Sequence, residues 1–275
     1  MRDITFGQYY PTGSIIHKMD PRIKIIAALI YMATIFFAKS VMSYAFMVAV
    51  AVMLTVSAKI PLRLMLKGIK PLIFIIIFTS VFNVFIHSGA HPILQWRFIN
   101  IYGEGVVFAA KMVVRLICLV TGTTILLSYT TTPLELTSGI ETLLKPLAKI
   151  KVPSHEFAMM ISIALRFIPD LIVETDRIIS AQKARGADFE SGGLIKRAKA
   201  FLPVLIPLFV SAFRRADELA AAMECRCYNG AKGRTKMKIL RFAAADYVFI
   251  AAVCAAMAAM VCLNLAELNL FGFIR

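Results

Sequence analysis

Two arginines, Arg185 and Arg226, each lie just before a helix stop signal. Gly186 follows the first, and the pair Asn229-Gly230 follows the second. A guanidinium near the carboxyl end of a helix is favoured by the negative end of the helix dipole. It can also form paired hydrogen bonds with a carboxylate or with backbone carbonyls of a second protein. The chemistry that these positions predict is docking on a partner.

Other residues that carry chemistry do not form complete sites in the sequence. His87 and His91 are one helical turn apart, but a zinc site takes three or four ligands and no third is evident. Cys225 and Cys227 flank Arg226, but the sequence shows no further ligands that would complete a metal site with them. The chain has no Gly-x-x-x-x-Gly-Lys-Ser/Thr phosphate loop and no Ser/His/Asp arrangement in a nucleophile context. We therefore expect no metal site, no cofactor and no ATP hydrolysis by this chain alone.

The two docking arginines require long helices to position them. The first helical pattern leads to Arg185, and one of its faces is apolar, with Ile161, Leu165, Ile168, Ile172 and Ile179. Another face is charged and spaced for ion pairs along the helix, with Arg166, Asp170, Glu174 and Arg177. A second pattern runs over 194–223 and leads to Arg226. Both helices are too charged to span a bilayer, so another surface must cover their apolar faces, and their internal prolines predict kinks: Pro169, Pro203 and Pro207.

Composition places the rest of the chain in a membrane. Of its 275 residues 59% are hydrophobic, and the mean hydropathy is +0.77, which indicates an integral membrane protein. The net charge of +15 would suggest nucleic acid in a soluble protein. Here the cations gather in expected cytoplasmic segments, as the positive-inside rule requires, so we expect no nucleic-acid partner. The five cysteines form no disulfide framework, and the amino terminus lacks a cleavable signal pattern.

Five membrane spans are predicted, at residues 23–37, 41–58, 71–86, 106–129 and 242–265. Asp20 and Pro21 are typical of a helix start and open the first span. Residues 59–70 hold basic but no acidic side chains, which predicts a cytoplasmic loop. Alternation then places the amino terminus inside and the carboxyl terminus outside. The predicted organisation is an amino-terminal membrane part (1–129), a cytoplasmic coupling-helix region (130–241) and a final spanning helix (242–275).

Lys111 and Arg115 lie one turn apart within the fourth predicted span. A charge at membrane depth is costly, so a functional role is one interpretation. The other is that Lys111 extends to the outer surface while Arg115 bonds backbone carbonyls inside the bundle, and we favour this one.

Three ordered motifs resemble a known family. Residues 181–189 (AQKARGADF) and 223–228 (MECRCY) are similar to the paired arginine motifs of the transmembrane T component of energy-coupling factor (ECF) importers. Residues 14–24 (SIIHKMDPRIK) resemble the amino-terminal signature of that family. One departure is Cys227, which stands where the family usually has glycine. The pair Asn229-Gly230 is an alternative stop for the second helix.

The resemblance implies an all-α, multi-pass protein of the cell membrane that is not itself an enzyme. A T component holds two cytoplasmic ABC ATPases, which bind the ATP, and a membrane-embedded S component, which captures a vitamin or metal. The ATPase-docking residues would be Ala184, Arg185, Gly186, Cys225, Arg226 and Cys227. The S-component contact would involve the apolar face Ile161, Leu165, Ile168 and Ile172.

Two alternatives remain at this stage. One is a T component dedicated to cobalt or nickel. The other is a membrane-embedded enzyme that uses polar residues such as Asn83, Lys111 and Arg115. The unusual polar residues mark cytoplasmic helix ends more than an intramembrane cluster, which favours coupling.

The predicted orientation can be tested by cysteine labelling in intact cells. A single cysteine introduced at Ser88 should react with a membrane-impermeant maleimide, because residues 87–105 are nearly uncharged and are predicted to be external. A single cysteine at Ser191 should react only after the cells are opened. The reverse pattern would overturn the orientation.

Overall fold

The computed structural model describes residues 9–86, 92–96, 99–146, 153–189, 191, 193–230 and 242–272. Helices dominate, and the chain divides into two compact units. The spanning unit comprises Thr5–Thr142 and Leu240–Arg275, and the two-helix unit consists mainly of Leu143–Ile239. The predicted all-α membrane fold is confirmed, with one short β-hairpin added to it.

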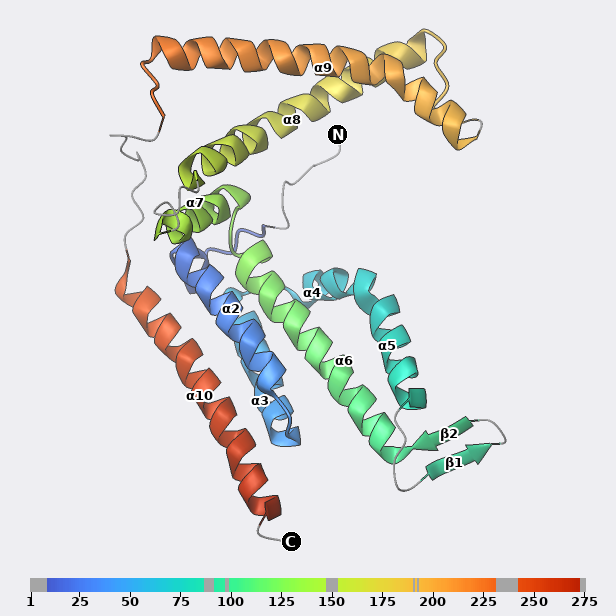
Figure 1. Ribbon diagram of the computed structural model, residues 1–275, viewed down its shortest axis with the longest axis vertical. Coiled ribbons are helices and arrows are strands. Elements are labelled where there is room, and N and C mark those ends of the chain that lie inside the picture. The colour runs from blue at the N-terminus through green and yellow to red at the C-terminus, as the bar shows by residue number, and fades with distance from the viewer. Residues whose placement is uncertain are drawn as a thin grey trace. The chain divides into compact units, whose positions relative to one another are not determined.

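Four helices form the body of the spanning unit and lie side by side in Figure 1. They are α2 (Pro21–Phe37), α3 (Val41–Ala58), α6 (Gly103–Thr123) and α10 (Ala244–Gly272). All four contribute buried side chains to one core, among them Ile35, Met47, Cys118 and Met260. At Gly122 a Cβ atom would lie 2.1 Å from the ring of Tyr31, so only glycine permits this approach of α6 to α2.

Four helical segments are long and apolar enough to cross a membrane. They are Val41–Ala58, Leu62–Phe85, Gly103–Tyr129 and Ala244–Asn264. They correspond to the second to fifth predicted spans. The first predicted span is α2, whose 17 residues are about 26 Å long at 1.5 Å per residue. This is slightly less than the ~30 Å hydrocarbon thickness of a bilayer.

The segment predicted as a loop over residues 59–70 is largely helical. Helix α4 (Leu62–Ile69) continues through a 3₁₀ turn, η1 (Lys70–Leu72), into α5 (Ile73–Ile86). The loop prediction was wrong because the basic residues recur at helical spacing and leave another face apolar. On that face Leu64 and Met65 pack on a core cluster. An antiparallel hairpin of β1 (Pro92–Trp96) and β2 (Ile99–Tyr102) then precedes α6.

Helix α6 continues through a π-helical turn, η2 (Thr124–Tyr129), and leads to α7 (Pro133–Leu144). Helix α7 begins at a reciprocal pair of hydrogen bonds. The backbone N–H of Glu135 donates to Thr132 Oγ1 (3.3 Å), and the backbone N–H of Thr132 donates to Glu135 Oε2 (3.4 Å). This reciprocal pair is a capping box.

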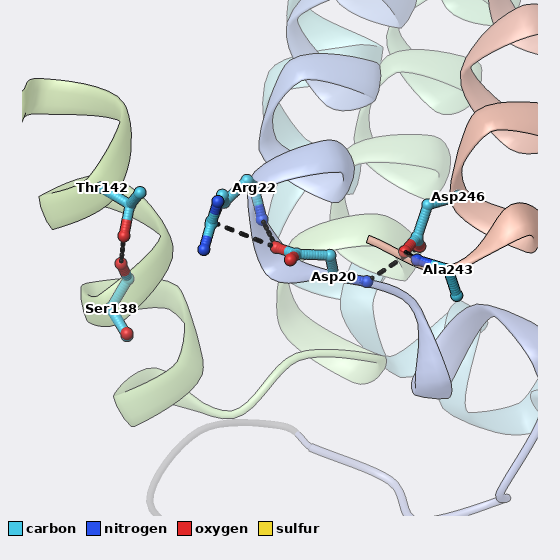
Figure 2. A network of polar contacts seen from close by, with 6 residues as sticks. All are labelled: Asp20, Arg22, Ser138, Thr142, Ala243 and Asp246. Atoms are coloured by element: carbon cyan, nitrogen blue, oxygen red, sulfur yellow. Dashed lines mark hydrogen bonds and ion pairs between the residues drawn. The ribbon is translucent and has the colours of Figure 1, made fainter. Parts of the chain in front are cut away.

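A polar network joins the beginning of α2 to the beginning of α10 (Figure 2). Asp20 caps α2 by accepting a hydrogen bond from the N–H of Arg22 (2.9 Å). The carboxylate of Asp246 accepts from the N–H of Asp20 (3.0 Å) and from the N–H of Ala243 (2.8 Å). Arg22 completes the network, because its guanidinium lies 3.6 Å from Asp20 Oδ1 and 5.2 Å from the ring centre of Phe242.

The opposite part of α10 is held by a second polar contact. The side-chain amide of Asn264 donates to the carbonyl of Phe37 (2.7 Å), and its oxygen accepts from the hydroxyl of Ser43 (2.7 Å). Helix α10 is therefore tied to α2 near its start and to the corner between α2 and α3 farther along.

The short helix α1 (Ile15–Lys18) belongs to the same end of the spanning unit as the Asp20 network. Lys24, which has no exposed surface, donates to the carbonyls of His17 (3.2 Å) and Thr130 (2.7 Å). Thr12 donates to the carbonyl of Ala58 (2.9 Å). Residues 12–24 thus contact the ends of three spanning segments, which gives the amino-terminal motif a structural role.

The two-helix unit consists of α8 (Ser154–Ala184) and α9 (Leu194–Cys225), which pack against each other. Figure 1 shows α9 bent in its amino-terminal half, the half that contains Pro203 and Pro207. Proline removes a backbone donor and clashes with the preceding turn, so the bend has a local cause.

The Asp246 network predicts a specific loss of stability. Asp246→Ala leaves the N–H of Asp20 without its acceptor in a buried site, which costs about 1–3 kcal/mol. Thermal unfolding of the purified protein in detergent should shift to lower temperature. The matched control is Asp217→Ala, because Asp217 is exposed on α9 and should leave the transition unchanged. An equal effect of the two substitutions would contradict the proposed role of the network.

Candidate functional site

The carboxyl end of α8 has a Schellman geometry that presents Arg185. Gly186 adopts a positive φ of 85°, and its N–H donates to the carbonyl of Lys183 (3.0 Å). The N–H of Ala187 donates to the carbonyl of Gln182 (3.0 Å). These two bonds satisfy the last carbonyls of the helix and reverse the chain immediately after Arg185.

The carboxyl end of α9 repeats this geometry residue for residue. Cys227 occupies the position of Gly186, with a φ of 56°, and its N–H donates to the carbonyl of Glu224 (2.9 Å). The N–H of Tyr228 donates to the carbonyl of Met223 (3.0 Å). Cys227 itself therefore provides the stop of α9, although cysteine has no special tolerance for positive φ, and Asn229-Gly230 is not needed.

All six predicted docking residues are exposed: Ala184, Arg185, Gly186, Cys225, Arg226 and Cys227. Within the part of the chain that the structure describes, neither Arg185 nor Arg226 uses its guanidinium in a hydrogen bond or ion pair. Figure 1 shows the carboxyl ends of α8 and α9 at opposite ends of the helix pair. The structure thus brings each arginine to a free helix end but does not bring the two together.

The turn after Arg185 is anchored by contacts that the sequence pattern did not predict. Phe189 is buried, and its ring centre lies 5.2 Å from that of Phe201 on α9. The carboxylate of Asp188 accepts hydrogen bonds from the N–H and the hydroxyl of Ser191. An aromatic residue just after a helix stop is the one signal that could have suggested this anchor.

Among the described residues, Asp170 and Glu174 on the charged face of α8 form their ion pairs with α9 and not along α8 itself. Arg215 of α9 lies 2.6 Å from Glu174 and 3.7 Å from Asp170. These side chains are 25–60% exposed, so we expect the pairs to fix the relative register of the helices more than to stabilise them. The predicted partners Arg166 and Arg177 are exposed.

Helix α8 has two apolar faces, and only one of them meets α9. A pocket of about 260 Å³ between the helices is lined on the α8 side by Ile163, Phe167 and Leu171. The predicted contact face, with Ile161, Leu165, Ile168 and Ile172, is rotated from it by roughly 130° at 100° per residue. Ile161 is 47% exposed and the other three are half-buried. The predicted face is therefore directed away from α9.

The polar residues of the spanning unit make separate local contacts. Arg115 donates to the carbonyl of Ala38 (2.8 Å) and to the hydroxyl of Tyr44 (2.6 Å), as the favoured interpretation of this arginine predicted. Asn83 donates to the carbonyl of Thr79 in its own helix (2.7 Å). Among the described residues, no three His, Cys, Asp or Glu side chains gather in a group that could hold a metal. His87 and His91 lie outside the described residues.

Comparison with known proteins yields a family model and close relatives. The family model described as "CbiQ: Cobalt transport protein" matches residues 12–237. A protein of Clostridium kluyveri is 51% identical over 266 residues, which cover 96% of this chain and 97% of that protein. A protein of Ruminiclostridium cellulolyticum is 54% identical over 246 residues (90% and 91%), and one of Bacillus subtilis is 43% identical over 246 residues (90% and 92%). All three are named "Energy-coupling factor transporter transmembrane protein EcfT".

The geometry of Cys227 predicts a stabilising substitution. A left-handed conformation costs a residue with a Cβ about 1–2 kcal/mol, and glycine avoids this cost but gains freedom in the unfolded chain. Cys227→Gly should therefore stabilise the last turn of α9 by about 0.5–1 kcal/mol, which slows amide hydrogen exchange there roughly two- to fivefold.

The matched control is Gly186→Ala at the corresponding position of α8. It introduces a Cβ at a φ of 85° and should speed exchange in the last turn of that helix. Unchanged or faster exchange in Cys227→Gly would show that the left-handed conformation is not a source of strain.

Proposed function

The chain belongs to the family of transmembrane components of energy-coupling factor transporters, and on this premise we propose that it couples two cytoplasmic ABC ATPases to a membrane-embedded S component. The ATPases would bind and hydrolyse ATP, and the S component would capture the transported micronutrient. This chain would be the non-catalytic element between them.

The observation that carries the proposal is how little of α8 and α9 is buried. Over the described residues of these two helices, only Ser154, Ala158 and Val204 are buried. Large apolar side chains on α9 remain exposed, among them Leu202, Leu205, Ile206, Phe209, Val210 and Phe213. Contiguous exposed apolar surface of this kind is typical of protein or membrane contact sites. Two helices of about 47 Å with so few buried residues are suited to contact partners along their length.

The helix ends support the assignment of the ATPase contacts. Arg185 and Arg226 are presented by the same backbone geometry, are exposed, and stand at opposite ends of the pair. A repeated recognition element suits two copies of one kind of partner. We therefore propose that each arginine docks on one ATPase.

The far face of α8 supports the assignment of the S-component contact. Ile161, Leu165, Ile168 and Ile172 are directed away from α9, so the packing between the two helices does not account for their apolar character. We propose that the S component contacts this face.

The description of the family model mentions cobalt, so a dedicated cobalt or nickel transporter is the second candidate. The relatives are named for the energy-coupling factor transporter, and none of the three names specifies a metal. We favour the general coupling role for this reason. An enzyme within the membrane is less favoured, because Asn83 and Arg115 are engaged with separate partners.

Loss of both arginines should uncouple transport without unfolding the protein. The double variant Arg185→Ala/Arg226→Ala removes two charge-assisted contacts, each worth about 1.5–3 kcal/mol. We expect normal insertion and expression but no ATP-driven uptake. The control is Arg166→Ala/Arg177→Ala, which removes two exposed arginines from the middle of α8 and should retain uptake. Uptake at the normal rate in the first variant would refute the docking role.

A carboxylate on the far face of α8 should release the S component selectively. Leu165→Glu or Ile172→Glu would bury an unpaired charge in the proposed contact, while the helix ends remain intact. In a pull-down that quantifies each subunit, we expect the S component to be lost and both ATPases to remain. Leu171→Glu, on the face that meets α9, is the control and should lose both kinds of partner. Loss of both partners, or of neither, in the first two variants would contradict the assignment.

A further inference from the structure

An apolar groove of about 510 Å³ runs along the spanning unit between α2, α3 and α10. Its floor is formed by buried side chains of all three helices, Ile35, Met47 and Met260. One wall is a series of alanines on α10 that includes Ala252, Ala256 and Ala259. The small size of these residues leaves open the space that larger side chains would fill.

Along α3 and α10 the groove is about as long as one membrane leaflet is thick. It extends from Phe249 to Met260 on α10 and from Ser57 to Phe46 on α3. Eleven residues of helix rise about 16 Å, and half of the ~30 Å hydrocarbon core is about 15 Å. Ser57 is one residue from the end of α3, and Phe249 is near the start of α10. The groove therefore opens at the end of the spanning unit where α10 begins, which is predicted to be cytoplasmic, and on α2 it reaches as far as Ile35, two residues before that helix ends.

The lining offers almost nothing to a polar ligand. It includes three polar side chains, and two of them are satisfied by the protein itself. The hydroxyl of Tyr31 donates to the carbonyl of Cys118 (2.8 Å), and that of Thr34 donates to the carbonyl of Ile30 (2.7 Å). The third, Ser57, lies at the end of the groove nearest the membrane surface. This arrangement fits a molecule whose apolar part lies in the groove and whose polar part lies at the Ser57 end.

The volume of the groove further limits which molecule could occupy it. The groove is partly open, so in a membrane a neighbouring apolar group can enter it. A spanning helix about 10 Å across and 30 Å long occupies roughly 2400 Å³, several times the volume of the groove. A single lipid chain that follows one leaflet is a far closer match.

We propose that the groove binds one acyl chain of a phospholipid from the adjoining leaflet. Two exposed lysines lie within two residues of groove residues at its surface end and suit an anionic headgroup. Lys18 precedes Met19, and Lys59, which is exposed, lies two residues after Ser57. The bound lipid would complete the packing of α10 against α2 and α3, in addition to the polar contacts of Asp246 and Asn264.

The test is photo-crosslinking of the full-length chain in nanodiscs. The probe is phosphatidylglycerol with a diazirine in one acyl chain, present as a trace component of phosphatidylcholine bilayers. After irradiation, mass spectrometry locates the modified residues. We expect the highest yield at groove residues such as Val50 and Ala256, at least fivefold above exposed apolar residues elsewhere, such as Phe78 on α5.

A filled groove should lose this signal. Ala256→Trp places an indole in the groove and should reduce crosslinking there at least fivefold. Ala258→Trp is the matched control, because Ala258 is an exposed residue of α10 that does not line the groove. If Ala256→Trp cannot be recovered from membranes, Ala252→Phe takes its place, and the map of the unsubstituted protein tests the proposal without any variant.

Two results would overturn the proposal. Equal yields at groove residues and at Phe78 would mean that the groove contains only exchanging bilayer lipid. Protection of the groove in the assembled transporter, together with crosslinks from a photoreactive residue at position 256 to another protein chain, would assign it to a partner. Neither result bears on the ATPase contacts, so the proposed function is tested separately.

Discussion

The spanning unit depends on one buried charge, the ammonium group of Lys24. It has no exposed surface, and backbone carbonyls of His17 and Thr130 replace its water. Burial of a charge is costly unless it is paired and hydrogen-bonded, and Asp20, Asp246 and Glu135 supply the nearby negative charge. Because the carbonyls belong to segments far apart in the sequence, these segments must all be in place for Lys24 to be satisfied. Residues 14–24, which include Asp20 and Lys24, therefore determine how the ends of α2, η2 and α10 are arranged.

This arrangement contrasts with the two-helix unit. The spanning unit is held by a buried polar contact at Asp246, an exposed one at Asn264 and a shared apolar core. Helices α8 and α9 have few buried residues, partly exposed ion pairs at Arg215 and an aromatic contact between Phe189 and Phe201. A well-packed membrane part together with a sparsely packed helix pair fits a protein that transmits movement between partners, because weakly packed elements can shift at low cost.

The sequence was sufficient to predict those elements whose structure depends on nearby residues. The cap at Asp20 and the long helices before Arg185 and Arg226 depend on residues within a few positions of one another. The length of the apolar runs likewise located the four long apolar segments. The sequence was misleading at residues 59–70, because a high density of lysine and arginine is compatible with both a loop and an amphipathic helix.

Contacts between distant residues could not be predicted from the sequence. Asp246 accepts from a backbone N–H 226 positions away, and Asn264 bonds a carbonyl 227 positions away. No periodicity connects such pairs. The strain at Cys227 is a different case: it is visible only from its φ of 56°, since the sequence also allowed a stop at Asn229-Gly230. At the candidate site, the sequence predicted which arginines end the helices. Their shared turn geometry, and the fact that neither guanidinium has a partner among the described residues, required the structure.

The central claim is that the ends of α8 and α9 each contact an ATPase, and site-specific crosslinking tests it most directly. A photoreactive amino acid at Ala184 or at Cys225, next to each arginine, would be irradiated in the purified intact transporter. The same residue at Phe209, on the exposed apolar surface of α9, serves as the reference position. Our account predicts that both helix-end probes crosslink to ATPase subunits and that the reference probe does not. Crosslinks from both helix ends only to lipid, or only to the S component, would contradict it.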